Sequence, residues 1–198
     1  MLARVTGGKE KAVLLKARQL YSAAIKAAEA EKKATEAENS KYSIEYDKNN
    51  RPFVVIEEDI LADVPRAEWI KTVIDNLRTK YPNGVEVGNN VIDIDATSRR
   101  EMTLSRYSRT LLRTLPKIYA NKLRATNNAD EILKASRNYV NEALKHPRKD
   151  NIQEFARGNV LLRIGKNDYR AEVIVGKRAN GNLIMYDIIG FQPTNIKK

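Results

Sequence analysis

Three strand-like segments separated by turn sequences occupy residues 159–191, and they constrain the fold more than any other feature. The segments read NVLLRI, YRAEVIVGK and LIMYDIIGF, with β-branched and aromatic residues in largely alternating order. The connections Gly165–Asp168 and Arg178–Gly181 are short and contain glycine and asparagine. Such short connections join antiparallel neighbours, because parallel strands need a crossover of a dozen or more residues. The sequence therefore predicts a three-stranded antiparallel meander.

The residues before this meander show mostly helical patterns. Pro65 opens a segment in which Trp69, Val73 and Leu77 share one face, and Pro82 follows its end. Further helices are predicted over residues 9–38, 98–115, 117–125 and 128–145, a helical turn over 150–156, and hairpins over 42–60 and 85–95. The expected fold class is α+β, with helices followed by a C-terminal antiparallel β-meander, and an N-terminal helix and hairpin–helix region ahead of them.

Charge divides the chain into three segments. Lys and Arg outnumber Asp and Glu by 8 to 5 in residues 1–40, are outnumbered 7 to 11 in residues 41–96, and are in excess by 21 to 9 in residues 97–198. We expect a helical linker or delivery segment over residues 1–40, an acidic hairpin–helix–hairpin entry region over 41–96, and a basic α+β domain over 97–198. A strongly basic domain suits a polyanion such as nucleic acid, although a basic surface can also be merely solvated.

Several kinds of site are disfavoured by composition. The chain has no cysteine and one histidine, so it can form neither a disulfide nor a thiolate zinc site. No metal site and no cofactor are predicted, although a carboxylate magnesium site stays open. No apolar run approaches the ~20 residues that cross a bilayer, so no membrane span is expected. The N-terminus shows no clear signal-peptide pattern.

A ridge of arginines is predicted on the helix over 98–115. Ser98 and Glu101 have the spacing of a capping box, and the leucines of the segment share one side. The residues expected on the opposite side are Arg99, Arg106, Arg109 and Arg113. Since no acidic residue accompanies them on that side, phosphate contact is favoured over a solvated face.

A second cluster surrounds the only histidine. His146 lies between Lys145 and the sequence Pro147-Arg148-Lys149. An imidazole with a pKa near ~6.5 can act as a base or an acid, and nearby cations favour its neutral form. The alternative is a histidine at a helix C-terminus, stabilised by the helix dipole. In the middle strand of the meander, Arg170 is expected on the open face with Glu172, and Arg163 can join them; cross-strand pairing in solvent is the alternative.

The C-terminal part resembles a known nuclease superfamily. The motifs are the histidine and its basic neighbours, the sequence NDYxxEV at residues 167–173, and YDIIxxxPT at residues 186–194. Over roughly residues 128–198 they are similar to the C-terminal module of the barnase/EndoU/colicin/RelE-like nucleases. The form in question occurs in large polyvalent proteins of phages and mobile elements and at the tips of polymorphic toxins, including those of contact-dependent inhibition. The basic segment 97–198 is then the nuclease-like domain.

The resemblance implies a metal-independent ribonuclease toxin that cleaves RNA by 2′-hydroxyl transesterification, with tRNA as a candidate target. It implies the catalytic residues His146, as the base, with Lys149, Arg157, Tyr169 and Thr194. The expected nucleic-acid-binding residues are Arg99, Arg106, Arg109, Arg113, Arg148, Arg163 and Arg170. Such a toxin would act in the cytoplasm of a target cell, be delivered as part of a larger secreted protein, and need an acidic immunity or antitoxin protein. The alternatives are a non-catalytic nucleic-acid-binding module of a polyvalent protein, and a structural adaptor.

Overall fold

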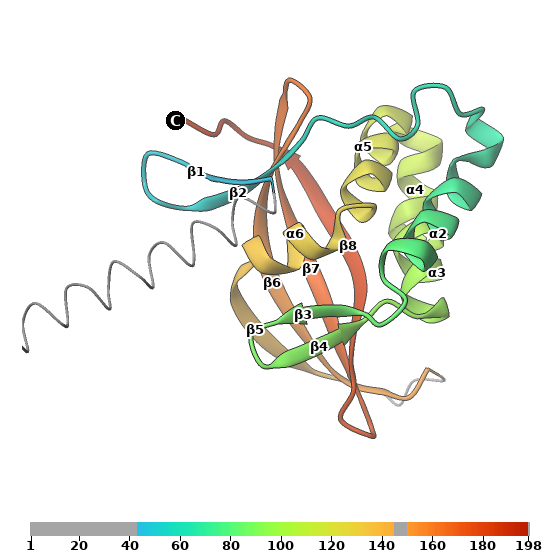
Figure 1. The fold of residues 1–198 in the computed structure, drawn as a ribbon, viewed down its shortest axis with the longest axis vertical. Coiled ribbons are helices and arrows are strands. Elements are labelled where there is room, and N and C mark those ends of the chain that lie inside the picture. Colours follow the sequence, from blue (N-terminus) through green and yellow to red (C-terminus); the bar gives the residue numbers. More distant parts are fainter. Residues whose placement is uncertain (1–42, 145–149, 198) are drawn as a thin grey trace, which may run out of the picture. The chain divides into compact units, whose positions relative to one another are not determined.

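One large sheet with helices packed against it forms the described part of the chain (Figure 1). The computed structural model describes residues 43–144 and 150–197, so the predicted N-terminal helix lies outside the described residues. The strand order is β1-β2-β6-β7-β8-β4-β3, and β5 pairs with β6 beside this path. The α+β fold class is therefore confirmed.

The elements have the following bounds. The strands are β1 (Ile44–Tyr46), β2 (Pro52–Ile56), β3 (Val85–Val87), β4 (Asn90–Asp93), β5 (Arg137–Ala143), β6 (Ile152–Ile164), β7 (Asn167–Arg178) and β8 (Leu183–Pro193). The helices are η1 (Arg66–Glu68), a single 3₁₀ turn, followed by α2 (Trp69–Lys80), α3 (Ala96–Leu104), α4 (Arg106–Thr114), α5 (Pro116–Thr126) and α6 (Ala129–Ala135).

The predicted meander forms the centre of the sheet. Strands β6, β7 and β8 pair antiparallel over most of their length, with Leu162 opposite Tyr169 and Val173 opposite Ile188. Their turns contain Gly165 at φ 56° and Gly181 at φ 88°, a left-handed conformation that glycine adopts without strain.

Both predicted hairpins join this meander through parallel contacts that the sequence analysis did not anticipate. The hairpin β1–β2 adds to one edge, where Phe53 lies opposite Leu161 of β6. The hairpin β3–β4 adds to the other edge, where Ile92 lies opposite Leu183 of β8. Residues 43–198 accordingly form one compact unit, so the acidic and basic charge segments share one sheet and one core.

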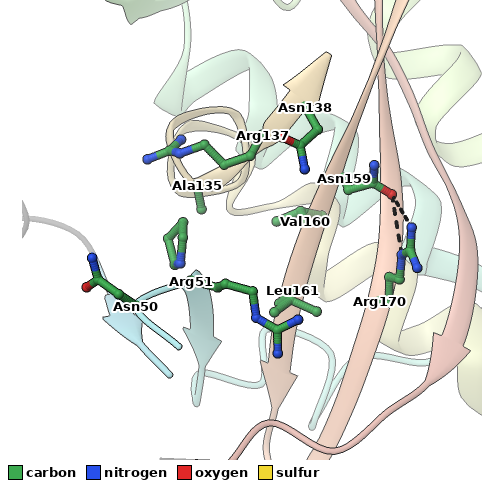
Figure 2. Close-up of a pocket in the computed structure, with 10 residues that line it drawn as sticks. Asn50, Arg51, Ala135, Arg137, Asn138, Asn159, Val160, Leu161 and Arg170 are labelled. Atoms are coloured by element: carbon green, nitrogen blue, oxygen red, sulfur yellow. Dashed lines mark hydrogen bonds between the residues drawn. The ribbon is translucent and has the colours of Figure 1, made fainter. Parts of the chain in front are cut away.

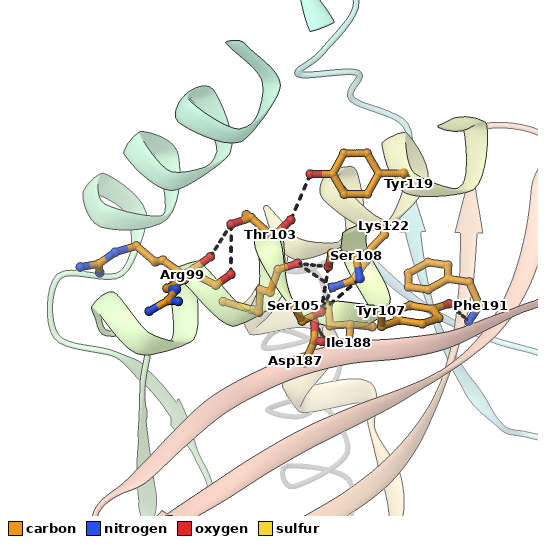
Figure 3. A network of polar contacts seen from close by, with 12 residues as sticks. Arg99, Thr103, Ser105, Tyr107, Ser108, Tyr119, Lys122, Asp187, Ile188 and Phe191 are labelled. Carbon is orange, nitrogen blue, oxygen red and sulfur yellow. Dashed lines mark hydrogen bonds and ion pairs between the residues drawn. The ribbon is translucent and has the colours of Figure 1, made fainter. Parts of the chain in front are cut away.

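The helices cover one face of the sheet, as Figure 1 shows. The core between them combines alternate residues of the strands, such as Leu162 and Val173, with helical residues such as Leu77, Met102 and Leu123, all with at most 2% of their surface exposed. A buried ion pair also joins the two layers: Lys122 of α5 donates to Asp187 of β8 and to the carbonyl oxygen of Met102 (Figure 3).

The helix predicted over 128–145 is wrong beyond Ala135. α6 ends where Ser136 turns to an extended backbone at ψ 141° and its hydroxyl donates to the carbonyl oxygen of Ile132 at 2.7 Å. The chain then forms β5, which pairs antiparallel with the first half of β6. The predicted helical turn over 150–156 is likewise mostly strand, because β6 begins at Ile152. Pairing between these two segments overrides their local helix propensity.

The single helix predicted over 98–115 is two helices. α3 is capped by Asp95, whose carboxylate accepts from the amide of Ser98 at 2.9 Å, so Ser98 is not the cap. Ser105 then ends α3 and caps α4, accepting from the amide of Ser108 at 3.2 Å. The predicted arginine ridge is therefore divided, with Arg99 on α3 and the other three arginines on α4.

Candidate functional site

A pocket of about 490 Å³ lies where β6 exchanges one neighbouring strand for another (Figure 2). Arg137 of β5 pairs with Asn159, whereas two residues later Phe53 of β2 pairs with Leu161. Both neighbours occupy the same edge of β6, and neither covers the position between them. The first residues of β2 and β5 therefore bound a notch in the edge of the sheet.

Arginine and asparagine side chains surround this notch. The residues that line it are Asn50, Arg51, Pro52, Ala135, Arg137, Asn138, Asn159, Val160, Leu161 and Arg170. This lining contains no carboxylate, so its only formally charged side chains are those of its three arginines. Guanidinium groups bind phosphate in a bidentate manner, and carboxamides add hydrogen-bond donors and acceptors. A lining of this composition is suited to an anionic ligand.

Each arginine of the notch is held by a different partner. Arg51 donates to the Asp47 carboxylate at 2.8 Å, which keeps the pKa of Asp47 below its usual value. Arg137 donates to the carbonyl oxygens of Lys134 and Ser136 at 2.6 and 2.9 Å. The guanidinium of Arg170 donates to Oδ1 of Asn159, the closer contact at 2.9 Å (Figure 2).

These contacts orient the guanidinium groups without neutralising most of them. Within the described residues, only Arg51 of the three forms an ion pair, whereas Arg137 and Arg170 bond to neutral oxygens. Two positive charges are thus pre-positioned and uncompensated, which lowers the cost of binding a phosphate group.

Backbone strain is concentrated at the same place. Asn50 at φ 58° and Asn138 at φ 57° both line the notch and both adopt the left-handed conformation. In β5 the positive φ lies at an irregularity where the register shifts between Arg137 and Val140. Such bulges redirect side chains and often occur beside active sites. Here the bulge places Arg137 and Asn138 on the notch.

A carboxylate–arginine cluster adjoins the notch along β6. Arg157 lies two residues before Asn159, so both project from the open face of the sheet, the face away from the helices. Its Nε donates to Glu142 of β5 at 2.6 Å, and its Nη1 lies 3.7 Å from Glu172 of β7. All three side chains are between 38% and 55% exposed, so a bound ligand can reach them.

The structure brings together only some of the residues implied by the resemblance. Arg157 and Arg170 share the open face, whereas the neighbouring Arg163 is bound to the Asp168 carboxylate at 2.8 and 3.1 Å. Tyr169 lies on the opposite face, only 7% exposed, and its hydroxyl accepts from Nδ2 of Asn121 at 2.9 Å. The sheet therefore separates Tyr169 from Arg157.

The other predicted residues lie elsewhere. Thr194 is exposed beyond the end of β8, and its amide donates to the carbonyl oxygen of Asp168 at 3.0 Å. Arg99 donates to the carbonyl oxygen of Ile94 at 2.6 Å, on the helical side of the sheet. The exposed arginines of α4 are also on that side: Arg106, Arg109 and Arg113. Three predicted residues lie outside the described residues: His146, Arg148 and Lys149.

Most residues of the notch were not predicted as site residues from the sequence. Asn50 falls within the hairpin predicted over 42–60, and Arg137 and Asn138 fall within the helix predicted over 128–145. A signal was present, because Ser136 and Asn138 flank Arg137 and favour helix ends and left-handed positions. Asn50 and Arg51 come close to Arg137 and Asn138 only because β2 pairs in parallel with β6. Patterns among residues close in sequence do not predict such a long-range pairing.

Neither a metal-ligand cluster nor a membrane-spanning helix is found among the described residues. In the described ranges 43–144 and 150–197, no three acidic or histidine side chains are grouped in a way that could hold a metal ion. No helix within those ranges is long and apolar enough to cross a membrane. Comparisons with protein-family models, with curated proteins and with solved structures find no match to this chain.

Proposed function

We propose that this protein binds RNA across the open face of its sheet, with a backbone phosphate held in the notch. The observation that carries the proposal is the lining of the notch, in which three arginines and three asparagines converge without a carboxylate. Arginines suit phosphate oxygens, and exposed carboxamides suit the edges of unpaired bases. The net charge of +11 further favours a polyanionic partner.

Salt-dependent binding tests this proposal. RNA affinity is measured between about 50 and about 200 mM salt for the wild type, Arg137→Gln and Arg170→Gln. Each variant is expected to bind more weakly, and the slope of log K against log salt should fall by ~0.7 for each phosphate contact removed. The control is Arg78→Gln, which removes an exposed arginine from α2 that lies 3.9 Å from Asp75. Equal slopes in all four proteins would refute binding in the notch.

We further propose that the bound RNA is cleaved without a metal ion, as the nuclease resemblance implies. The cluster of Glu142, Arg157 and Glu172 supports this reaction because it adjoins the notch. A phosphate that binds Arg157 competes with the carboxylates for the guanidinium, and a released carboxylate can act as a base. These carboxylates thereby add a second candidate for the role first given to His146.

In this reaction a base takes the proton of the 2′-hydroxyl, and the 2′ oxygen forms a bond to phosphorus. The bond from phosphorus to the 5′ oxygen then breaks, and an acid protonates the departing oxygen. The products are a 2′,3′-cyclic phosphate and a 5′-hydroxyl end. Arg157 is suited to stabilise the negative charge that develops on the phosphorane oxygens. From the segment outside the described residues, His146 remains the proposed base and Lys149 a proposed stabiliser of the phosphate charge.

Expression in cells separates cleavage from binding alone. The wild type is compared with Arg157→Gln, Glu172→Gln and His146→Ala by following growth and total RNA. A ribonuclease toxin should arrest growth and leave discrete fragments ending in cyclic phosphate, and cleavage by the purified protein should persist in EDTA. Intact RNA with all four proteins, combined with salt-dependent binding, would instead identify a non-catalytic nucleic-acid-binding module.

The proposed partner of such a toxin is an acidic immunity or antitoxin protein that covers the open face. Its carboxylates would take the positions of RNA phosphates at Arg137 and Arg170, because both arginines lack ion-pair partners among the described residues. The proposed place of action is the cytoplasm of a target cell, reached as part of a larger secreted protein. Loss of partner binding in Arg137→Gln and Arg170→Gln, but not in Arg78→Gln, is the expected result.

A further inference from the structure

A second pocket, of about 390 Å³, lies on the helical side of the sheet, away from the open face. Its walls come from η1, α2 and α5 and from the first residue of β7. The lining residues are Arg66, Trp69, Pro116, Lys117, Ala120, Asn121, Arg124 and Asn167. This pocket combines an aromatic ring with three cationic side chains and has no carboxylate in its lining.

The aromatic wall is held in one orientation. The indole Nε1 of Trp69 donates to the carbonyl oxygen of Val64 at 2.9 Å, and the side chain packs against the hydrophobic core. Pro116 and Ala120 of α5 contribute the apolar surface beside it. A ring that is already immobilised can stack on a planar ligand without a further loss of side-chain freedom.

The cationic wall contains charge that the described residues do not compensate. Arg66 donates through Nη2 to the carbonyl oxygen of Leu112 at 2.9 Å, which orients its guanidinium toward a neutral partner. Lys117 is exposed and forms no ion pair within the described part of the chain. By contrast, Arg124 is already paired with the carboxylate of Asp59 through two contacts of 2.7 Å.

The start of α5 adds to this positive potential. The helix begins at Pro116 with no side-chain cap and no acidic residue in its first turn. The positive end of its dipole, formed by the amino-terminal amides, is therefore not compensated from within the helix. Lys117 in that turn, and Arg66 beside it, are cations where the dipole disfavours cations. An anion bound between them would remove this unfavourable arrangement.

We propose that this pocket binds a nucleotide, with the base stacked on Trp69 and the phosphate between Arg66 and Lys117. The apolar wall of Trp69, Pro116 and Ala120 distinguishes this site from one for a simple inorganic anion. The same chemistry fits a free mononucleotide and one unit of a nucleic-acid strand. The site is separate from the notch and does not depend on the function proposed for the open face.

The chain offers a direct probe, because Trp69 is its only tryptophan. Tryptophan emission of the full-length protein is followed while AMP, adenosine, inorganic phosphate or a short oligoribonucleotide is added. AMP is expected to quench the emission with saturation, and adenosine and phosphate should each bind at least tenfold more weakly than AMP. Tighter binding of the oligoribonucleotide would identify a strand as the source, whereas equal or tighter binding of AMP would identify a free nucleotide.

Three variants locate the binding site. Arg66→Gln and Lys117→Gln should each weaken AMP binding about tenfold, the usual effect of losing one hydrogen bond to a charged group. Lys71→Gln is the matched control: it removes a lysine from the same helix as Trp69, on a side chain that is 80% exposed and paired with Asp75. Its affinity for AMP should match that of the wild type.

Two results would overturn the proposal. The first is emission that stays unchanged on addition of AMP up to millimolar concentration, since a base stacked on Trp69 must alter it. The second is quenching that Arg66→Gln and Lys117→Gln leave intact. Arg137→Gln serves to separate the two sites, because it should weaken RNA binding at the notch and leave AMP quenching unaltered.

Discussion

Removal of the Lys122 amine should destabilise the fold far more than removal of a surface lysine. The side chains of Lys122 and Asp187 are 0% and 5% exposed, so Lys122→Met leaves a buried carboxylate without its cation (Figure 3). Asp187 keeps one hydrogen bond, from the amide of Ile188 at 2.8 Å, and the carbonyl oxygen of Met102 loses a donor. Breaking a buried pair in this way costs about 3–5 kcal/mol.

That loss is a large part of the free energy of unfolding, which is about 5–15 kcal/mol for a typical domain. Urea denaturation of the full-length protein measures it, and the melting temperature should fall by roughly 10 °C. The matched control is Lys71→Met, which breaks an exposed pair with Asp75 at 3.0 Å and should leave the free energy of unfolding almost unchanged.

A double variant tests the cause of the loss. In Lys122→Met with Asp187→Leu no charge remains buried, so most of the stability should return. The reasoning is refuted if Lys122→Met costs no more than Lys71→Met. It is also refuted if the double variant is as unstable as the single one, because packing rather than charge would then explain the loss.

Substitutions at three further positions, Asn138, Glu131 and Gly158, probe other features. Asn138→Gly should be about as stable as the wild type but bind RNA more weakly. Asn138→Ala should be less stable than Asn138→Gly by about 1–2 kcal/mol, because alanine disfavours the φ of 57°. Equal stability of the two variants would contradict this reasoning. Burial, together with the adjacent Asp130 carboxyl, raises the pKa of Glu131 from 4.5 to about 8. The stability that the protonated form of Glu131 contributes is therefore complete below about pH 4.5 and is lost as the pH rises through about 8. Glu131→Gln should therefore raise the melting temperature more at pH 8 than at about pH 5, and the opposite order would contradict it. Gly158→Ala places a Cβ 2.7 Å from Cζ of Tyr139 and should lower the free energy of unfolding, measured by urea denaturation, by about 1 kcal/mol. When Tyr139 is also replaced by alanine, Gly158→Ala should no longer destabilise the protein, because the ring that it contacts is gone.

Local sequence signals predicted the parts of the fold that neighbours in sequence stabilise. The turns at Gly165 and Gly181 carry the glycines that their positive φ values favour, and the hairpins and the helix after Pro65 also follow from nearby residues. The parallel contacts of β2 and β4 could not be predicted in this way, because their partners lie more than ninety residues away in the sequence.

The candidate site was less predictable than the fold. Arg170 was recognised because alternation along a strand assigns a face, whereas Arg157 was implied only by the nuclease resemblance. The segment 137–143 was not recognised as a strand, because Tyr139, Val140 and Ala143 also have the spacing of a helical stripe. Its pairing with β6 decides the outcome, and that pairing is what places Arg137 and Asn138 in the notch.

The two parallel contacts of the sheet have a consequence for synthesis of the chain. A ribosome makes β2 and β4 long before their partners β6 and β8. The amide of Lys48 likewise donates to the carbonyl oxygen of Lys197, at 2.9 Å, which is made much later. Early segments that pair late give a high contact order and slow folding. A nascent polypeptide that ends before β8 therefore lacks the partner of β4, and the notch cannot form before β6 and β7 have been made.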